Sequence, residues 1–277
     1  MLQGTQMTKQ SPAISLLGLP YDANSSHLKG PADAPDAIRA AFRSPHSNTA
    51  SELGVELTEG LVWYDAGNLD IETLEPEVSN SVTTKEAEKL YSGGQKVIAL
   101  GGDHSVTYPL VKAAHAIHGP VDILHIDAHP DLYDDFDSNP FSHASPFARI
   151  MENGLANRLV QIGIRTMNDH QRQQAKRFDV EVIEMKDWNN IPRFNFEGPL
   201  YLSIDIDGID PAYAPGVSHN EPGGLSSRDV ISVIQRFSGN LIGADVVELN
   251  PTQDINDMTA MLAAKLVKEI MGRMAKA

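Results

Sequence analysis

Short apolar runs recur along this chain of 277 residues, and most are followed by a stretch with helical periodicity. Strands alternating with helices in this way predict a mainly parallel sheet with helices on both faces. We expect strands at 13–19, 61–65, 96–100, 121–127, 158–164, 180–183, 200–206 and 241–247, and helices at 33–42, 82–91, 106–117, 142–151, 169–178, 227–237 and 258–274. The sequence therefore predicts an α/β fold with about eight strands in a single domain spanning 1–277, with 1–12 poorly ordered.

One of these runs, Val121 to Leu124, leads directly into the sequence HIDAHPD at 125–131. Along an extended backbone, alternate residues face the same way, so Asp127, His129 and Asp131 share one face. They lie where the strand ends, and parallel sheets bind their ligands at the carboxyl ends of the strands. Two carboxylates and an imidazole in such a row predict a metal site.

Two further strand ends carry the same kinds of side chain. Asp205 and Asp207 follow the apolar residues of 200–204, and His104 lies in GGDHS at 101–105, after another apolar run. Carboxylates brought this close together need compensating positive charge to stay ionised. A pair of divalent cations would supply it, and the oxygen-rich ligand set without thiolates favours Mn²⁺, although ligand type leaves Fe²⁺, Co²⁺, Ni²⁺ and Zn²⁺ open.

A single aspartate or histidine at a strand end is more often a cap or a turn residue than a metal ligand. The agreement of three strand ends favours the metal site here. His125 shares the face of Asp127 but lies two residues deeper in the strand, so we expect it to be a buried structural histidine.

The net charge of the chain is −15, which argues against nucleic-acid or anionic-membrane partners and favours a small cationic substrate. Cysteine is absent from the sequence, so disulfides and thiolate chemistry are excluded. No apolar run approaches the roughly 20 residues of a membrane span. The first residues, MLQGTQMTKQSP, match neither a signal peptide nor a transit peptide. By elimination, we expect a cytoplasmic protein.

Two divalent cations ordinarily activate water, so hydrolysis is the expected reaction. Glu248, at the end of the run 243–247, could accept parallel hydrogen bonds from a planar guanidinium, or could be only a polar strand end. His143 could carry a proton to a leaving amine, or could be only a solvated residue at the start of a helix.

These motifs together resemble those of the ureohydrolase superfamily of arginases and agmatinases. The resemblance rests on GGDHS (101–105), DAHPD (127–131), SIDIDGIDPAYAPG (203–216), EPGGL (221–225) and DVVELNP (245–251). It covers nearly the whole chain from about Leu16, and SHASPFARIMENG (142–154), APGVSHNEPGGLSSRDV (214–230) and MTAMLAAKLVKE (258–269) are most similar to plant-type arginases. The resemblance implies a three-layer α/β/α fold, a binuclear manganese centre with two Mn²⁺ per subunit, and a homo-oligomer, commonly a trimer or hexamer.

Matched by position, the resemblance implies one ion held by His104, Asp127, Asp131 and Asp205, and the other by Asp127, His129, Asp205 and Asp207. It also implies that a bridging hydroxide attacks the guanidinium carbon and that Asp131 receives its proton. His143 would shuttle protons and Glu248 would orient the guanidinium. The products would be urea and an amine.

The positions that bind the substrate's amino-acid end in animal-type arginases differ here. Asn168 stands in place of an aspartate, Tyr133 in place of an asparagine and His219 in place of a threonine, as in plant-type arginases. Our candidates for binding this end of the substrate are His219, Asn139 and Ser142.

Arginine hydrolysis is the leading interpretation, and hydrolysis of agmatine or of another guanidino acid is the alternative. An acidic loop with Asp134, Asp135 and Asp137 would repel the carboxylate of arginine unless these side chains point outward. A remote alternative is a metal-binding subunit without activity, because fold alone does not guarantee catalysis.

Overall fold

The computed structural model describes residues 13–58, 63–188 and 192–276, so the expectation for 1–12 lies outside the described residues. The strands are β1 (Ile14–Gly18), β2 (Trp63–Asn68), β3 (Lys96–Leu100), β4 (Val121–Ile126), β5 (Ala156–Ile164), β6 (Glu181–Glu184), β7 (Asn195–Asp205) and β8 (Ser238–Val247). The α-helices are α1 (Ala34–Phe42), α2 (Pro76–Ser92), α3 (Thr107–His118), α4 (Pro146–Glu152), α5 (Asp169–Arg177), α6 (Ser227–Arg236) and α7 (Met258–Ala275).

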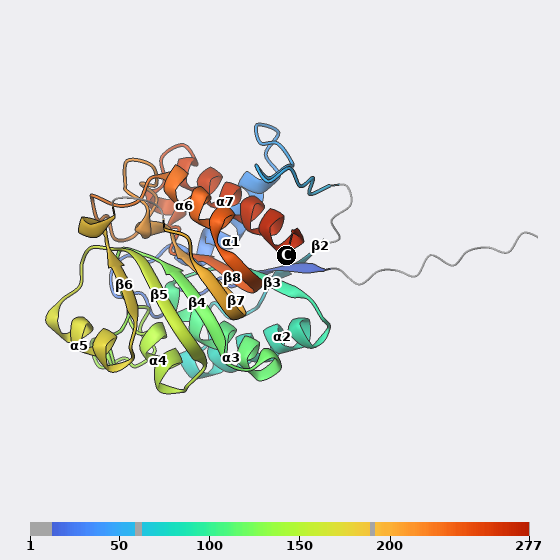
Figure 1. Cartoon of the computed structure of the whole chain (residues 1–277). Coiled ribbons are helices and arrows are strands. Elements are labelled where there is room, and N and C mark those ends of the chain that lie inside the picture. The colour runs from blue at the N-terminus through green and yellow to red at the C-terminus, as the bar shows by residue number, and fades with distance from the viewer. Residues whose placement is uncertain (1–12, 59–62, 189–191, 277) are drawn as a thin grey trace, which may run out of the picture.

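The eight strands form one sheet in the order β2-β1-β3-β8-β7-β4-β5-β6. All neighbouring strands pair in parallel. Helices α1, α6 and α7 cover one face of the sheet, and α2, α3, α4 and α5 cover the other (Figure 1). The predicted α/β fold with three layers is therefore confirmed.

The central strands are buried on both faces, because helices cover both sides. All six residues of β4 are buried, as are the last seven of β8. Such strands are largely apolar rather than alternating, which explains why the apolar runs are visible in the sequence. One apolar core lies around α7, and a second lies around α3.

Element boundaries differ from the predicted ones mainly where the sequence is polar. Helix α2 begins at Pro76, six residues before the predicted start, because its first turns carry few apolar residues. Strand β2 begins at Trp63, and residues 61–62 of the predicted strand lie outside the described residues. Asp33 is the N-cap residue of α1, but its side chain makes no capping hydrogen bond.

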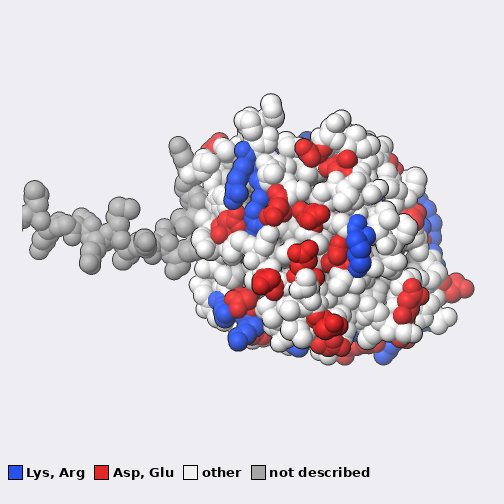
Figure 2. Space-filling view, turned by 180° about the vertical axis from the view of Figure 1, so that it is seen from behind, with Lys and Arg blue, Asp and Glu red and all other residues white. Residues whose placement is uncertain are grey.

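Acidic side chains are spread over the surface, as the net charge of −15 requires. Figure 2 shows Asp and Glu at many places on one face, interspersed with fewer Lys and Arg. Within the described residues, no helix has the length and apolar character needed to cross a membrane.

Candidate metal centre and substrate cavity

Four adjacent strands end at the site. In the sheet order β3-β8-β7-β4, the first strand leads to His104, the second to Glu248, the third ends at Asp205 and the fourth leads to Asp127. Because all four strands are parallel, their carboxyl ends lie at the same edge of the sheet. The fold therefore brings together side chains that are separated by up to 144 residues in the sequence, as between His104 and Glu248.

The imidazole of His104 is fully buried, and three carboxylates surround its Nδ1 atom. An oxygen of Asp131 lies 3.0 Å from Nδ1, and oxygens of Asp127 and Asp205 each lie 3.2 Å away. None of these three oxygens makes a hydrogen bond with Nδ1. A buried nitrogen and three carboxylate oxygens that converge without hydrogen bonds are a suitable ligand set for a cation.

The hydrogen bond at the other ring nitrogen determines the tautomer of His104. Ser203 donates its hydroxyl hydrogen to Oδ1 of Asp245 at 2.7 Å, so its oxygen is free to accept from Nε2 of His104 at 2.9 Å. Nε2 therefore carries the hydrogen, and Nδ1 presents a lone pair to the carboxylates. Metal-binding histidines are commonly oriented in this way by a second hydrogen bond.

A second group of ligands adjoins the first through Asp127. Nδ1 of His129 lies 3.4 Å from Oδ1 of Asp127 and 3.2 Å from Oδ2 of Asp207. The other oxygen of Asp127, Oδ2, faces His104. One carboxylate thus has one oxygen in each group, which is the geometry needed to bridge two ions.

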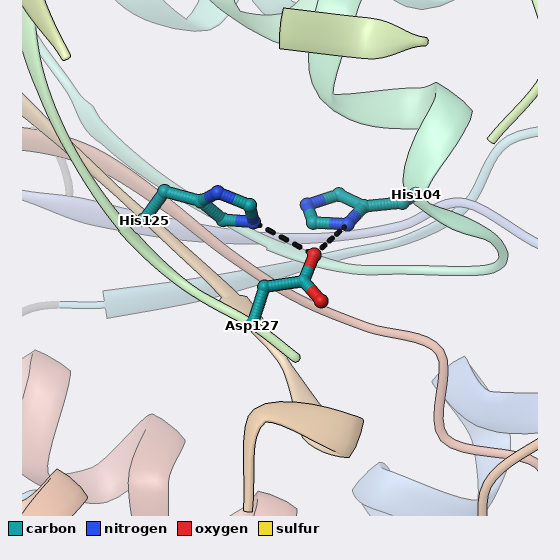
Figure 3. A group of neighbouring side chains, drawn as sticks. All are labelled: His104, His125 and Asp127. Atoms are coloured by element: carbon teal, nitrogen blue, oxygen red, sulfur yellow. Dashed lines mark hydrogen bonds and ion pairs between the residues drawn. The ribbon is translucent and has the colours of Figure 1, made fainter. Parts of the chain in front are cut away.

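His125 lies beside His104 and Asp127, but its own hydrogen bonds show a different role (Figure 3). The side-chain amide of Gln161 donates to the carbonyl of Pro130 at 2.7 Å and lies 3.0 Å from Nδ1 of His125. Nδ1 therefore accepts, and Nε2 donates to Oδ2 of Asp127 at 2.9 Å. His125 is fully buried, as expected, and it orients a carboxylate instead of offering a lone pair to a cation.

The electrostatics of the cluster also favour a bound cation. Burial, together with the charges of Asp207 and Asp127, raises the pKa of Asp205 well above its ordinary value. Burial likewise raises the pKa of Asp207. Both shifts disfavour the ionised carboxylates, and divalent cations would supply the compensating positive charge.

His143 and Glu248 form a buried ion pair next to the cluster, with Nδ1 of the imidazole 2.7 Å from Oε1 of the carboxylate. Although burial lowers it, the charge of Glu248 raises the pKa of His143 to about 9. In the neutral ring, Nε2 of His143 accepts from the backbone N–H of Ser26 at 3.1 Å, and in the charged ring Nε2 can instead donate to the Ser26 hydroxyl at 2.8 Å. His143 therefore connects Glu248 to a serine that the sequence analysis did not single out.

Two of these functional candidates lie on left-handed backbone. Asp131 has a φ of 49° and Glu248 a φ of 63°. This conformation is costly for residues with side chains and tends to be retained at functional sites. Both residues line the cavity beside the cluster.

The cavity has a volume of about 280 Å³, which is near the lower end of the range for ligand sites. Its wall includes Ser26, His129, Asp131, Tyr133, Phe136, His143, Thr166, Gln171, Asp205, Asp207, His219, Glu221 and Glu248. Of the three candidates for the amino-acid end of the substrate, His219 lies in this wall.

Asn139 and Ser142 lie outside the cavity wall, and their polar groups have protein partners. Asn139 donates to Oδ1 of Asn24 and accepts from the backbone of Phe141. Ser142 is buried, and its hydroxyl accepts from the backbone of Ala144. Tyr133 and Gln171, which the sequence analysis did not propose as substrate-binding residues, occupy the wall instead.

Comparison with known proteins agrees with this geometry. Residues 12–272 match the model of the arginase family. The chain belongs to the arginase family. It is 45% identical to the mitochondrial arginase 1 of Arabidopsis thaliana, over 95% of this chain and 82% of that protein. A mitochondrial agmatinase of Gallus gallus is less similar, at 33% identity over 96% of this chain and 82% of that protein.

Solved structures place this arginase-family chain with the same relatives. The structure of an arginase from Medicago truncatula superposes with a TM-score of 0.92 and is 42% identical, covering 95% of this chain and 87% of that one. The resemblance to ureohydrolases, and to plant-type arginases in particular, is therefore confirmed.

The expectation of a cytoplasmic location is contradicted by these comparisons, because the similar arginase of Arabidopsis thaliana is named mitochondrial. That expectation came from eliminating targeting signals in residues 1–12, which lie outside the described residues. Elimination was therefore a poor guide to the compartment.

Proposed function

We propose that this chain hydrolyses the guanidino group of L-arginine to give L-ornithine and urea. The observation that carries the proposal is the lone pair of His104 Nδ1, directed at three carboxylates by the Ser203 hydrogen bond. The 45% identity to a plant arginase supports arginine as the substrate.

Two Mn²⁺ ions are the proposed cofactor, with Co²⁺ or Ni²⁺ as possible substitutes. His104, Asp127, Asp131 and Asp205 would hold one ion, and Asp127, His129, Asp205 and Asp207 the other. When bound, such ions lower the pKa of a water molecule towards neutrality and make it nucleophilic. Oxygen and imidazole ligands without thiolates suit Mn²⁺.

The remaining residues of the site would act on the substrate and its protons. Within the described residues, the side chain of Glu248 makes its two hydrogen bonds at Oε1, to the backbone N–H of His104 and to His143. Oε2 is left to accept from the N–H groups of a guanidinium. Asp131 would accept the proton of the attacking water, and His143 would pass a proton to the leaving amine as the C–N bond breaks.

We also propose that the chain acts as a single domain and assembles as a homo-oligomer, a trimer or hexamer. Light scattering of the purified protein tests the assembly directly. A monomer of 30.1 kDa would contradict it.

Urea release by the Mn²⁺-loaded protein tests the function, with arginine, agmatine and shorter guanidino acids compared side by side by kcat/KM. We expect arginine to be preferred. A preference for agmatine would overturn arginine as the substrate while leaving guanidine hydrolysis in place. Absence of turnover with every guanidine would instead indicate a metal-binding subunit without activity.

A further inference from the structure

Four imidazoles are grouped beside the cavity, and His219 lies at the centre of the group. Its ring centre is 5.4 Å from that of His27, 5.6 Å from that of His143 and 5.9 Å from that of His129. His129 belongs to the metal cluster, and His143 is paired with Glu248. His27 and His219 are therefore the two members of the group without a charged partner.

The ring nitrogens of His27 and His219 are free to bind a ligand. Neither ring makes a hydrogen bond or ion pair with another residue in the part of the chain that the structure describes. His219 lines the cavity, and His27 is exposed beside it, so the ring of His27 can turn without disturbing packed neighbours. Imidazole nitrogens that are not engaged elsewhere are the commonest metal ligands in proteins.

The spacing of the two rings suits one metal ion held between them. Zn²⁺ binds histidine nitrogens at about 2.0–2.1 Å, usually with tetrahedral geometry. With these bond lengths and angles, the centres of two imidazoles on one ion lie roughly 5.2 Å apart. The centres of His27 and His219 are 5.4 Å apart, and their planes are tilted by 47° rather than stacked. A small rotation of the exposed ring would complete such a site.

The number and type of ligands indicate which metal this pair would take. Among the described residues, His27 and His219 belong to no group of three potential ligands, so water would complete the coordination. Two imidazoles without a carboxylate favour Zn²⁺ over Mn²⁺, which prefers oxygen ligands. With only two protein ligands, the ion would bind more weakly than in the cluster and would exchange with free zinc.

Charges around the pair favour a cation at this place. Asp207 and Glu221 line the same cavity as His219, and the whole chain carries a net charge of −15. A negative field of this kind raises the local concentration of cations. An ion bound to His219 would also add two positive charges beside a cavity proposed to bind a guanidinium, and like charges repel.

We propose that His27 and His219 bind one Zn²⁺ ion beside the cavity, and that this ion inhibits the protein by repelling its cationic substrate. The inhibition rests on the proposed function, whereas the binding of zinc does not. Because His219 lines the cavity, ion and substrate would compete for the same space. Zinc should therefore raise KM for arginine and leave kcat nearly unchanged.

Calorimetric titration of the Mn²⁺-loaded protein with Zn²⁺ tests the binding. His27→Phe keeps a ring at this position but has no nitrogen ligand. Loss of a hydrogen-bond partner of a metal ligand already lowers metal affinity about 10- to 100-fold, so loss of a ligand should lower zinc affinity by about tenfold or more. His46→Phe, at an exposed histidine of another loop, is the matched control and should bind zinc as the unaltered protein does.

His219→Phe provides a second variant, and it should lose zinc affinity to the same extent as His27→Phe. The manganese content of the zinc-treated protein, measured by mass spectrometry, should not fall. Zinc affinity that is unchanged in His27→Phe would overturn the inference. Displacement of manganese as the only effect of zinc would also overturn it.

The position of the ion can be measured without turnover. Crystals of the Mn²⁺-loaded protein soaked in Zn²⁺, with anomalous diffraction recorded above and below the zinc absorption edge, should show zinc between the rings of His27 and His219. Zinc found only among the carboxylates of the cluster would contradict the proposed site.

Urea release at increasing arginine concentration tests the inhibition. Zinc should raise the apparent KM of the unaltered protein and of His46→Phe about tenfold more strongly than that of His27→Phe, which should have normal activity without zinc. Equal inhibition of all three proteins would overturn the inhibitory role. Failure of the unaltered protein to hydrolyse any guanidine would instead refute the proposed function, and calorimetry would still decide whether the zinc site exists.

Discussion

His143 and Glu248 are joined by a buried contact of 2.7 Å between Nδ1 and Oε1, although 105 residues separate them in the chain. The same carboxylate oxygen accepts the backbone N–H of His104 at 2.9 Å. Glu248 thus links the metal-site histidine to the residue proposed to carry protons. Its role can be tested separately from that of the metal ligands.

Glu248→Gln should retain the fold and the metal ions but lose turnover. The amide cannot provide the negative charge that the guanidinium requires, so we expect kcat/KM to fall by about 10²-fold or more. Metal content measured by mass spectrometry should match that of the unaltered protein. Glu197→Gln, at an exposed position of β7, is the control. Turnover close to normal in Glu248→Gln would remove this residue from its proposed role.

His129→Ala should lower metal content and activity together. The change removes one imidazole from the group formed with Asp127 and Asp207, and leaves their carboxylates with less compensation. Metal analysis and urea release are the measurements, and the exposed His46→Ala is the control. Loss of activity with full metal content would instead assign His129 to substrate binding.

Ser203→Ala should weaken metal binding although Ser203 is not a ligand. The variant leaves Nε2 of His104 without its acceptor, so the ring loses the hydrogen bond that directs Nδ1 at the carboxylates. Changes of this kind typically lower metal affinity about 10- to 100-fold. A calorimetric titration with Mn²⁺ measures the change in metal affinity. An unchanged affinity would mean that burial alone holds the ring in place.

The surface pair of Glu52 and Arg228 should make stability depend on pH. A hydrogen-bonded ion pair with Arg228 lowers the pKa of Glu52 to about 2, below its ordinary value. Its contribution to stability is therefore complete above about pH 4.5 and is lost as the pH falls towards 2. Because the pair is screened by solvent, we expect only about 0.5 kcal/mol.

Chemical unfolding of Arg228→Gln and of the unaltered protein, between about pH 7 and pH 3, tests this dependence. The difference in free energy of unfolding should shrink as the pH falls. Arg193→Gln, at another exposed arginine, should show no such trend. A difference that grows at acidic pH would contradict the assignment.

The clustering of aspartates and histidines could be predicted from the sequence because these residues follow buried strands. Asp127, Asp205 and His104 each end an apolar run, and parallel strands bring such positions to one edge. The position of β8 between β3 and β7 could not be predicted in this way, since it depends on pairing between strands distant in the chain. The sequence therefore identified Glu248 as a candidate site residue from its position at a strand end. It did not show which side chains lie beside Glu248.

The residues of the cavity wall were harder to predict, because this wall is formed by loops and by the start of a helix. Asn139 and Ser142 lie in the loop before α4, where their side chains stabilise turns of the loop itself. Tyr133 was noted only as a departure from the animal-type pattern, and no motif in the sequence marks Gln171. Asn168 contacts both residues, but its hydrogen bond to Tyr133 forms only when the loop after β4 lies against the start of α5.

The location of β8 also constrains the order in which the site can form. The strand is synthesised after β3 and β7, yet it separates them in the sheet. A nascent chain that has not yet produced 238–247 lacks both the spacer between His104 and Asp205 and the carboxylate of Glu248. The four strand ends that carry the cluster can therefore reach their final spacing only when translation has nearly finished.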